Sequence, residues 1–144
     1  MANYFDRFCN EGNAYINHLA NKLGHPEEKE KVIRLLKATL HTIRDRIIVT
    51  ENLNVLAQLP LFLKAVYIDQ WTYHEKPLQY KTIEGFLSQV EHYQQHHGEH
   101  AFNWKEPTID LVKIILNDLK ERYISEGAIR HIMCQLPEEI RSIF

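Results

Sequence analysis

Histidines concentrate in one short stretch of the chain, at His92, His96, His97 and His100. Histidines four residues apart on a helix lie near one face, and imidazole nitrogen is a common zinc ligand. We therefore take His92, His96 and His100 as a candidate zinc site. The sequence favours a different interpretation, a solvated polar face, because His92 and His96 turn about 120° to 160° away from the apolar stripe centred on Val90.

Aromatic side chains gather in the middle of the sequence and in the loop before the last long helix, at Tyr67, Trp71, Tyr73, Tyr80, Phe102 and Trp104. An apolar groove there would suit a partner helix, a small ligand or a second copy of the chain. We take Tyr67, Trp71 and Trp104 as the candidate groove residues. The alternative is that these rings cover a junction between two halves of the protein.

Cysteine nucleophiles and paired acidic residues give weaker evidence of a catalytic site. Cys134 precedes a Gln-Leu-Pro segment at a place where the first half of the chain has Ala57, which favours a small packing position on a helix. Cys9 has no evident base beside it. Asp45 and Glu121 occupy matching positions, but basic residues flank both, as is typical of a solvated helix end. We predict no catalytic residue.

Composition excludes several classes of protein. The chain has 144 residues, 44% hydrophobic and 25% charged, with a formal net charge of −2, so it lacks the basic excess of a nucleic-acid-binding protein. Its two cysteines have no CxxC spacing and fit free thiols in a reducing compartment. Its first residues are polar, and no apolar run approaches the length of a membrane span. We expect a cytoplasmic protein that binds no membrane and no nucleic acid.

The apolar spacing predicts an all-α protein with an internal repeat. One helical ladder has apolar residues at Ile33, Leu36, Leu40, Ile43 and Ile47. A second ladder returns a constant 76 positions later, at Ile109, Val112, Leu116, Leu119 and Tyr123. Pro26 precedes the first ladder and Pro107 the second, as suits the first turn of a helix.

The segments after the two ladders also match. Each continues into a short apolar helix that Thr50 or Ser125 would begin, then a Gln-Leu-Pro segment, then another helix. A further helix precedes each ladder, with Thr82 as the expected start of the second one. We predict two tandem four-helix repeats packed into one helical bundle-like domain, comprising repeat one at about 14–70, a connector at about 71–81 and repeat two at about 82–144.

These motifs carry a family resemblance. The tandem Gln-Leu-Pro segments, the string Ala57-Gln58-Leu59-Pro60 and the run Leu63-Lys64-Ala65-Val66-Tyr67-Ile68-Asp69-Gln70-Trp71 resemble the bacterial family called domain of unknown function 2267. The resemblance covers roughly Ala14 to Phe144. It supports the helical fold, and it implies no site residues, because that family has no established activity.

Two functional classes follow from these patterns. We predict a non-enzymatic interaction or scaffold module that needs no cofactor and binds a protein partner or a second copy of itself. The alternative is a zinc-binding protein that uses His92, His96 and His100.

Overall fold

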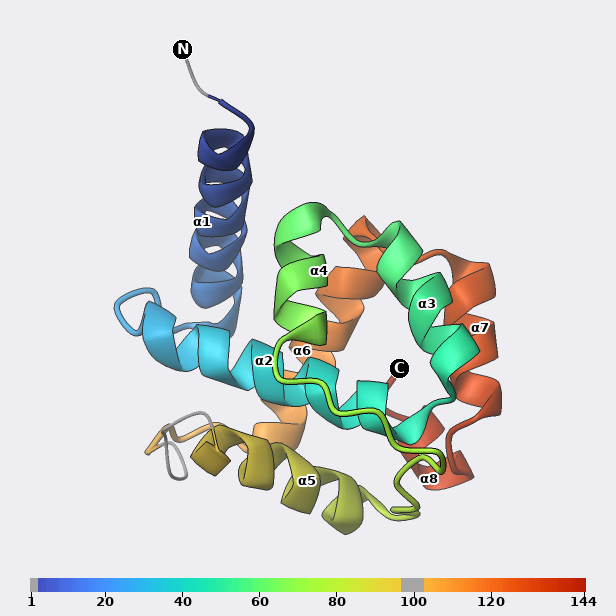
Figure 1. Ribbon diagram of the computed structural model, residues 1–144. Helices are drawn as coiled ribbons and strands as arrows, with labels where there is room; N and C mark the ends of the chain where they lie inside the picture. The colour runs from blue at the N-terminus through green and yellow to red at the C-terminus, as the bar shows by residue number, and fades with distance from the viewer. Residues whose placement is uncertain (1–2, 97–102) are drawn as a thin grey trace.

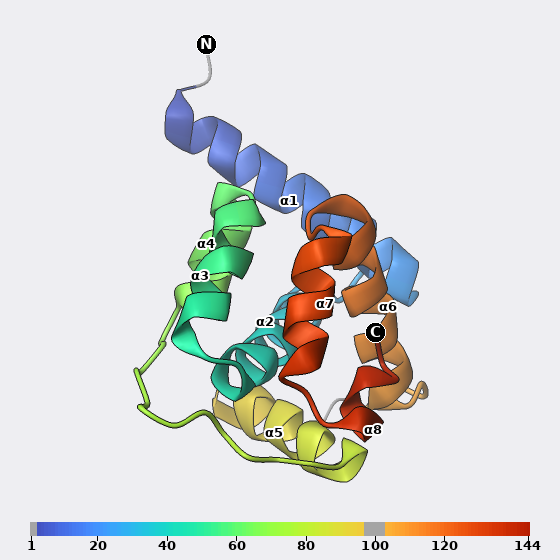
Figure 2. The same cartoon turned by 90° about the vertical axis from the view of Figure 1, so that its right-hand side faces the viewer.

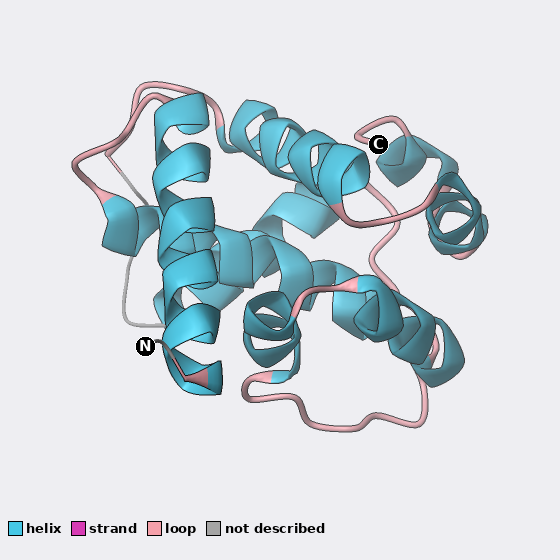
Figure 3. Ribbon diagram, turned by 90° about the horizontal axis from the view of Figure 1, so that it is seen from above, coloured by secondary structure: helices cyan, strands magenta, loops and turns pink. Residues whose placement is uncertain are grey.

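The computed structural model describes residues 3–96 and 103–144, and this part of the chain contains eight helices and no strand (Figures 1 and 3). The all-α prediction is therefore confirmed for the described residues. The helices are α1 (Tyr4–Leu23), α2 (Lys29–Arg46), α3 (Val49–Gln58), α4 (Leu61–Ile68), α5 (Ile83–His96), α6 (Thr108–Arg122), α7 (Glu126–Cys134) and α8 (Glu138–Arg141). None of them is both long enough and apolar enough to cross a membrane.

Helix α2 is the centre of the molecule, because α1, α4, α5 and α6 all contact it (Figure 1). The predicted ladder residues Leu36, Leu40 and Ile43 are buried. Leu35, Ala38 and His41, on other faces of the helix, are buried as well. A helix that is covered on several sides loses the single-stripe pattern of a surface helix.

The helix starts test the capping predictions. Ser125 is the N-cap of α7 and its hydroxyl accepts from the Ala128 amide at 3.2 Å, and the Thr82 hydroxyl accepts from the Gly85 amide at 3.0 Å. Thr50 was a wrong choice, since α3 begins at Val49 with Ile48 as its N-cap. Pro60 and Pro137 begin α4 and α8 as predicted, but α8 ends at Arg141, not at Phe144.

The two Gln-Leu-Pro segments form reciprocal hydrogen bonds between the halves. The amide of Ile48, at the start of α3, donates to Gln135 Oε1 at 2.8 Å. The amide of Ser125, at the start of α7, donates to Gln58 Oε1 at the same distance. Each glutamine therefore satisfies an amide at the start of a short helix in the other half, where α3 and α7 pack together (Figure 2).

Residues 71–81 form a helix-free segment along the end of α2. It supplies hydrogen-bond donors to two carbonyl groups near the end of α2, of which that of Asp45 lies in the last turn and has no donor inside its own helix. The Leu78 amide donates to Asp45 O at 2.8 Å, and the Tyr80 hydroxyl donates to Thr42 O at 3.0 Å. The connector thereby closes the C-terminal end of the central helix.

Candidate functional site

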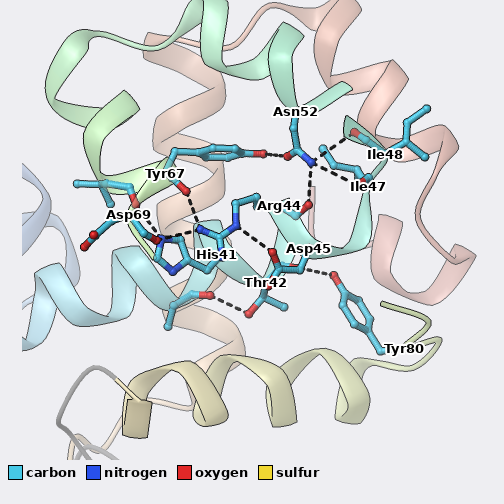
Figure 4. Close-up of polar contacts among 12 residues, drawn as sticks. His41, Thr42, Arg44, Asp45, Ile47, Ile48, Asn52, Tyr67, Asp69 and Tyr80 are labelled. Carbon is cyan, nitrogen blue, oxygen red and sulfur yellow. Dashed lines mark hydrogen bonds and ion pairs between the residues drawn. The ribbon is translucent and has the colours of Figure 1, made fainter. Parts of the chain in front are cut away.

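Arg44 organises a buried polar cluster at the end of α2 (Figure 4). Arg44 is 2% exposed, and its Nε donates to Asp45 Oδ1 at 2.9 Å. Its Nη1 donates to Tyr67 O at 2.8 Å and to Asp69 O at 3.1 Å, both at the end of α4. A cation is favourable at a helix C-terminus, where the last carbonyls lack partners, so Arg44 ties the end of α4 to α2.

Asn52 extends the cluster to α3. Its Nδ2 donates to Arg44 O at 2.9 Å, and its Oδ1 accepts from the Tyr67 hydroxyl. Burial raises the pKa of Tyr67 well above its ordinary range, with the Arg44 charge opposing this and the Asp45 charge adding to it. Tyr67 therefore stays a neutral hydrogen-bond donor, and helices α2, α3 and α4 are fixed to one another by a closed set of polar contacts (Figure 4).

A cavity of about 260 Å³ opens above this cluster, and we call it the Arg44 pocket. Its walls come from the last turn of α2, the start of α3 and the connector. Its lining comprises Arg44, Asp45, Ile47, Ile48, Val49, Thr50, Asn52, Trp71, Thr72, Tyr73, His74, Glu75 and Pro77. The guanidinium carbon of Arg44 lies 5.7 Å from the centre of the Trp71 ring. The pocket thus combines a buried cation with an aromatic wall.

Several hydrogen-bond donors in the pocket lining have no acceptor in the part of the chain that the structure describes. The hydrogen bonds of Arg44 use Nε and Nη1, and none of them uses Nη2. The amides of Val49 and Thr50, in the first turn of α3, also lack an acceptor there, because Ile48 offers no side-chain cap. The pocket lining therefore combines hydrogen-bond donors with exposed apolar side chains such as Ile48 and Tyr73.

The structure separates the three residues of the predicted groove. Trp71 lines the Arg44 pocket. Tyr67 is 1% exposed and lies beneath the surface, where its hydroxyl holds Asn52. Trp104 lies at the other end of α2, where its ring stacks on His25 with centroids 3.8 Å apart and its Nε1 donates to Glu28 Oε1 at 3.1 Å. The described structure therefore brings Trp104 together with neither of the other two.

The three predicted zinc ligands are not all described. His92 lies on the exposed side of α5, with its ring 5.6 Å from the ring of Tyr93. His96 is the last residue of α5, and its side chain is not described. His100 lies outside the described residues. Within residues 3–96 and 103–144 no group of three or more His, Cys, Asp or Glu side chains is placed to hold a metal ion. The zinc site remains a prediction.

Two interpretations of reactive side chains were wrong. Cys134 is exposed, and so is Ala57 at the matching place, so this position is not a packing position. The Asp45 side chain is 7% exposed and paired with Arg44, although we expected a solvated helix end. Glu121, its counterpart, does project into solvent. The difference arises because the connector and α4 cover the end of α2.

A second polar cluster, which the sequence analysis missed, joins α1 to α6. The Asp118 side chain is 1% exposed and accepts from Tyr15 Oη at 3.0 Å and from Lys22 Nζ at 3.0 Å. Arg122 donates to His18 Nδ1 at 3.2 Å, so Nε2 of that ring carries the proton and donates to Asp118 at 2.9 Å. Burial would raise the pKa of Asp118, but the hydrogen bonds from His18, Lys22 and Tyr15 outweigh it and hold the pKa below its ordinary value.

Asn52 and Asp118 are polar residues at apolar positions of a helical pattern, and the sequence alone shows this. Asn52 occupies the inward stripe of α3, three residues before Val55, and Asp118 occupies the inward stripe of α6, three residues after Ile115. A polar residue at an apolar ladder position must find a partner when it is buried. Such positions mark the buried polar clusters of this fold.

Comparison with known families gives one match. Residues 12–143 match a family model described as an uncharacterized conserved protein (DUF2267). No curated protein matches the chain significantly. This match confirms the family assignment that the Gln-Leu-Pro segments indicated.

Proposed function

Because the chain belongs to the DUF2267 family, whose description names no activity, we propose a function from its own geometry. The chain is a non-enzymatic interaction module that binds a short apolar segment of a partner protein in the Arg44 pocket. The observation that carries this proposal is the pocket itself, in which unused hydrogen-bond donors lie beside exposed apolar side chains.

The donors favour a polypeptide as the occupant. Arg44 Nη2 and the amides of Val49 and Thr50 all require acceptors, and main-chain carbonyl groups supply acceptors at regular spacing. Asp45 already neutralises much of the Arg44 charge, and Glu75 adds a negative charge to the lining. A neutral carbonyl group therefore suits the pocket better than a free anion.

The exposed part of the lining favours an apolar side chain on that segment. Tyr73 is 67% exposed although it lines the pocket, and Ile48 beside it is also exposed. Exposed aromatic residues around a cavity are typical anchors of protein interfaces. The segment would bury one apolar side chain against Trp71, Tyr73 and Ile48 while its backbone accepts hydrogen bonds from the donors of the lining.

The polar cluster under the pocket keeps this arrangement rigid. Arg44 is held by three hydrogen bonds and Asn52 by bonds to two helices, so little side-chain freedom remains to be lost on binding. Preorganised donors bind more tightly than mobile ones because the ordering cost is already met in the free protein. None of these groups has to change position when a ligand arrives.

The proposal is tested by selecting peptides on the folded chain. A phage-displayed library of random peptides of about 12 residues, long enough to span such a pocket, is selected on the immobilised protein. Selected peptides are synthesised and titrated into a Trp104→Phe variant, in which Trp71 is the one remaining tryptophan. We expect a saturable change of the Trp71 emission.

Two variants with similar exposure locate the site. Tyr73→Ser removes an exposed residue of the lining, and we expect it to weaken peptide binding about fivefold or more, because an interface tyrosine commonly contributes over ~1 kcal/mol. Leu53→Ser removes a residue of α3 that lies outside the pocket lining and is 56% exposed, against 67% for Tyr73, and we expect no change. Selection of no specific peptide, an unchanged Trp71 emission or equal effects of the two variants would each contradict the proposal.

A further inference from the structure

The N-terminal start of α1 projects beyond the other helices (Figures 1 and 2). The buried residues of α1 lie in its second half, between Tyr15 and Leu23. Its start is nevertheless a well-formed helix, with a capping box in which Asn3 and Asp6 exchange hydrogen bonds at 2.9 and 3.1 Å. Phe8 packs against the core, so the turn before it, where Tyr4 and Phe5 are exposed, is the part of α1 that would gain stability from a partner.

Four residues of α1 with helical spacing form one face of this projection, at Tyr4, Arg7, Glu11 and Ala14. Tyr4 is 55% exposed, so this face carries a protruding aromatic ring near its beginning. Near its other end lies a cavity of about 350 Å³, which we call the α1 cavity. Its walls include Glu11, Ala14, Tyr15, Phe62, Arg122 and Tyr123.

We propose that this face of α1 pairs with the same face of α1 in a second copy of the chain, in antiparallel orientation. In one register Tyr4 of each copy lies opposite Ala14 of the other, and Arg7 of each copy lies opposite Glu11 of the other. Tyr4 then enters the α1 cavity of the second copy, where it meets apolar walls and the Arg122 guanidinium. This inference does not depend on the function of the Arg44 pocket.

Self-complementarity is the reason for choosing a second copy as the occupant. A two-fold symmetric interface uses one patch twice, so the patch must contain both members of every contact. The α1 face contains two such pairs. The first is the protruding Tyr4 ring and the α1 cavity, about 15 Å further along the helix. The second is the opposite charges of Arg7 and Glu11. A single register satisfies both conditions at once.

The charges on this face are available for such pairing. Arg7 and Glu11 are exposed, and neither forms an ion pair or a side-chain hydrogen bond with any described residue. Two helices that meet over about three turns bury an area at the low end for specific complexes. We therefore expect a reversible dimer with a Kd of roughly 10–100 µM.

Analytical ultracentrifugation over a range of protein concentrations tests the pairing. We expect the wild-type chain to pass from monomer to dimer, and Tyr4→Ser to weaken the dimer about tenfold. Arg7→Glu and Glu11→Arg each place like charges opposite one another and should weaken it, whereas the double variant Arg7→Glu/Glu11→Arg restores opposite charges and should recover it. Lys113→Glu, a charge reversal on the exposed side of α6, is the control and should have no effect.

Far-UV circular dichroism of each variant separates loss of pairing from loss of the α1 helix itself. The helical signal of Tyr4→Ser, measured where the protein is monomeric, should match that of the wild-type monomer, since the capping residues Asn3 and Asp6 are unchanged. A wild-type chain that stays monomeric at the highest concentration overturns the proposal. So does a dimer that Tyr4→Ser leaves unchanged, or one that the double variant fails to recover.

Discussion

Replacement of Asn52 by alanine should destabilise the protein strongly, because this side chain is the buried link among three helices. Its amide nitrogen is a partner of Arg44 O, a carbonyl in the last turn of α2, and its oxygen accepts from the Tyr67 hydroxyl. Both of those groups are buried. Asn52→Ala would leave them without these partners, and the short alanine side chain offers no substitute.

The expected cost follows from the two groups that lose their partner. A buried donor or acceptor left unsatisfied costs about 1–3 kcal/mol, so Asn52→Ala should lower the free energy of unfolding by about 3 kcal/mol. For a chain near 150 residues this corresponds to a Tm lower by about 6–12 °C. Asn54→Ala, an exposed asparagine on the same helix, is the matched control and should stay within about 0.5 kcal/mol of the wild type.

Urea denaturation followed by circular dichroism measures these differences, and a double-mutant cycle isolates the contact. Tyr67→Phe removes the hydroxyl that Asn52→Ala leaves unpaired, so the double variant should be about 1–2 kcal/mol more stable than the sum of the two single effects predicts. The reasoning is refuted if Asn52→Ala costs less than about 1 kcal/mol, or if the two substitutions are additive.

Three further predictions concern other parts of the chain. Ile48→Ser should raise the free energy of unfolding by about 0.5–1 kcal/mol in urea denaturation, because it gives α3 the side-chain cap that it lacks. Asp118 has a pKa below its ordinary value in the folded state, so its contribution to stability is present above about pH 4 and is lost as the pH falls further. Asp118→Asn should therefore flatten the stability profile below about pH 4. Zinc titrated calorimetrically into chelator-treated protein without an affinity tag should bind weakly, and His92→Ala should leave the isotherm unchanged if the histidines form a solvated face.

Much of the fold was predictable because its signals are local. The two ladders, the prolines before α4 and α8, and the polar residues Thr82 and Ser125 each act within one or two turns of helix. The order of helices follows from such signals alone. The repeat was predicted from matching positions in the sequence. The corresponding helices are not equal in length, because α4 has 8 residues and α8 has 4.

The errors arose where distant parts of the chain decide the outcome. Thr50 looks like a cap, but the position that matches Ser125 is Ile48, whose amide is held by Gln135 from the other half. Arg44 lies in the last turn of α2, where a cation complements the dipole of its own helix. Its burial depends instead on carbonyl groups of α4, which no local pattern reveals.

The candidate site was only partly predictable for the same reason. Trp71 was identified from its aromatic neighbours, and it does line the Arg44 pocket. Its ring lies beside Arg44 because Gln70 adopts a left-handed backbone with φ of 58°, which turns the chain at the end of α4. A non-glycine residue in that conformation has no reliable sequence signature. The sequence therefore singled out Trp71, but it gave no sign of the polar cluster around Arg44.

The reciprocal hydrogen bonds of Gln58 and Gln135 bear on the role of the connector, residues 71–81. The pair of bonds is unchanged when the two halves exchange places, since Ile48 and Gln58 correspond to Ser125 and Gln135. Two separate polypeptides, each equal to one half, would carry the groups needed to satisfy one another. Residues 71–81 then act as a covalent tether, which holds one half near the other at an effective concentration of the order of millimolar. In the single chain these two bonds form within one molecule, so they do not depend on the protein concentration.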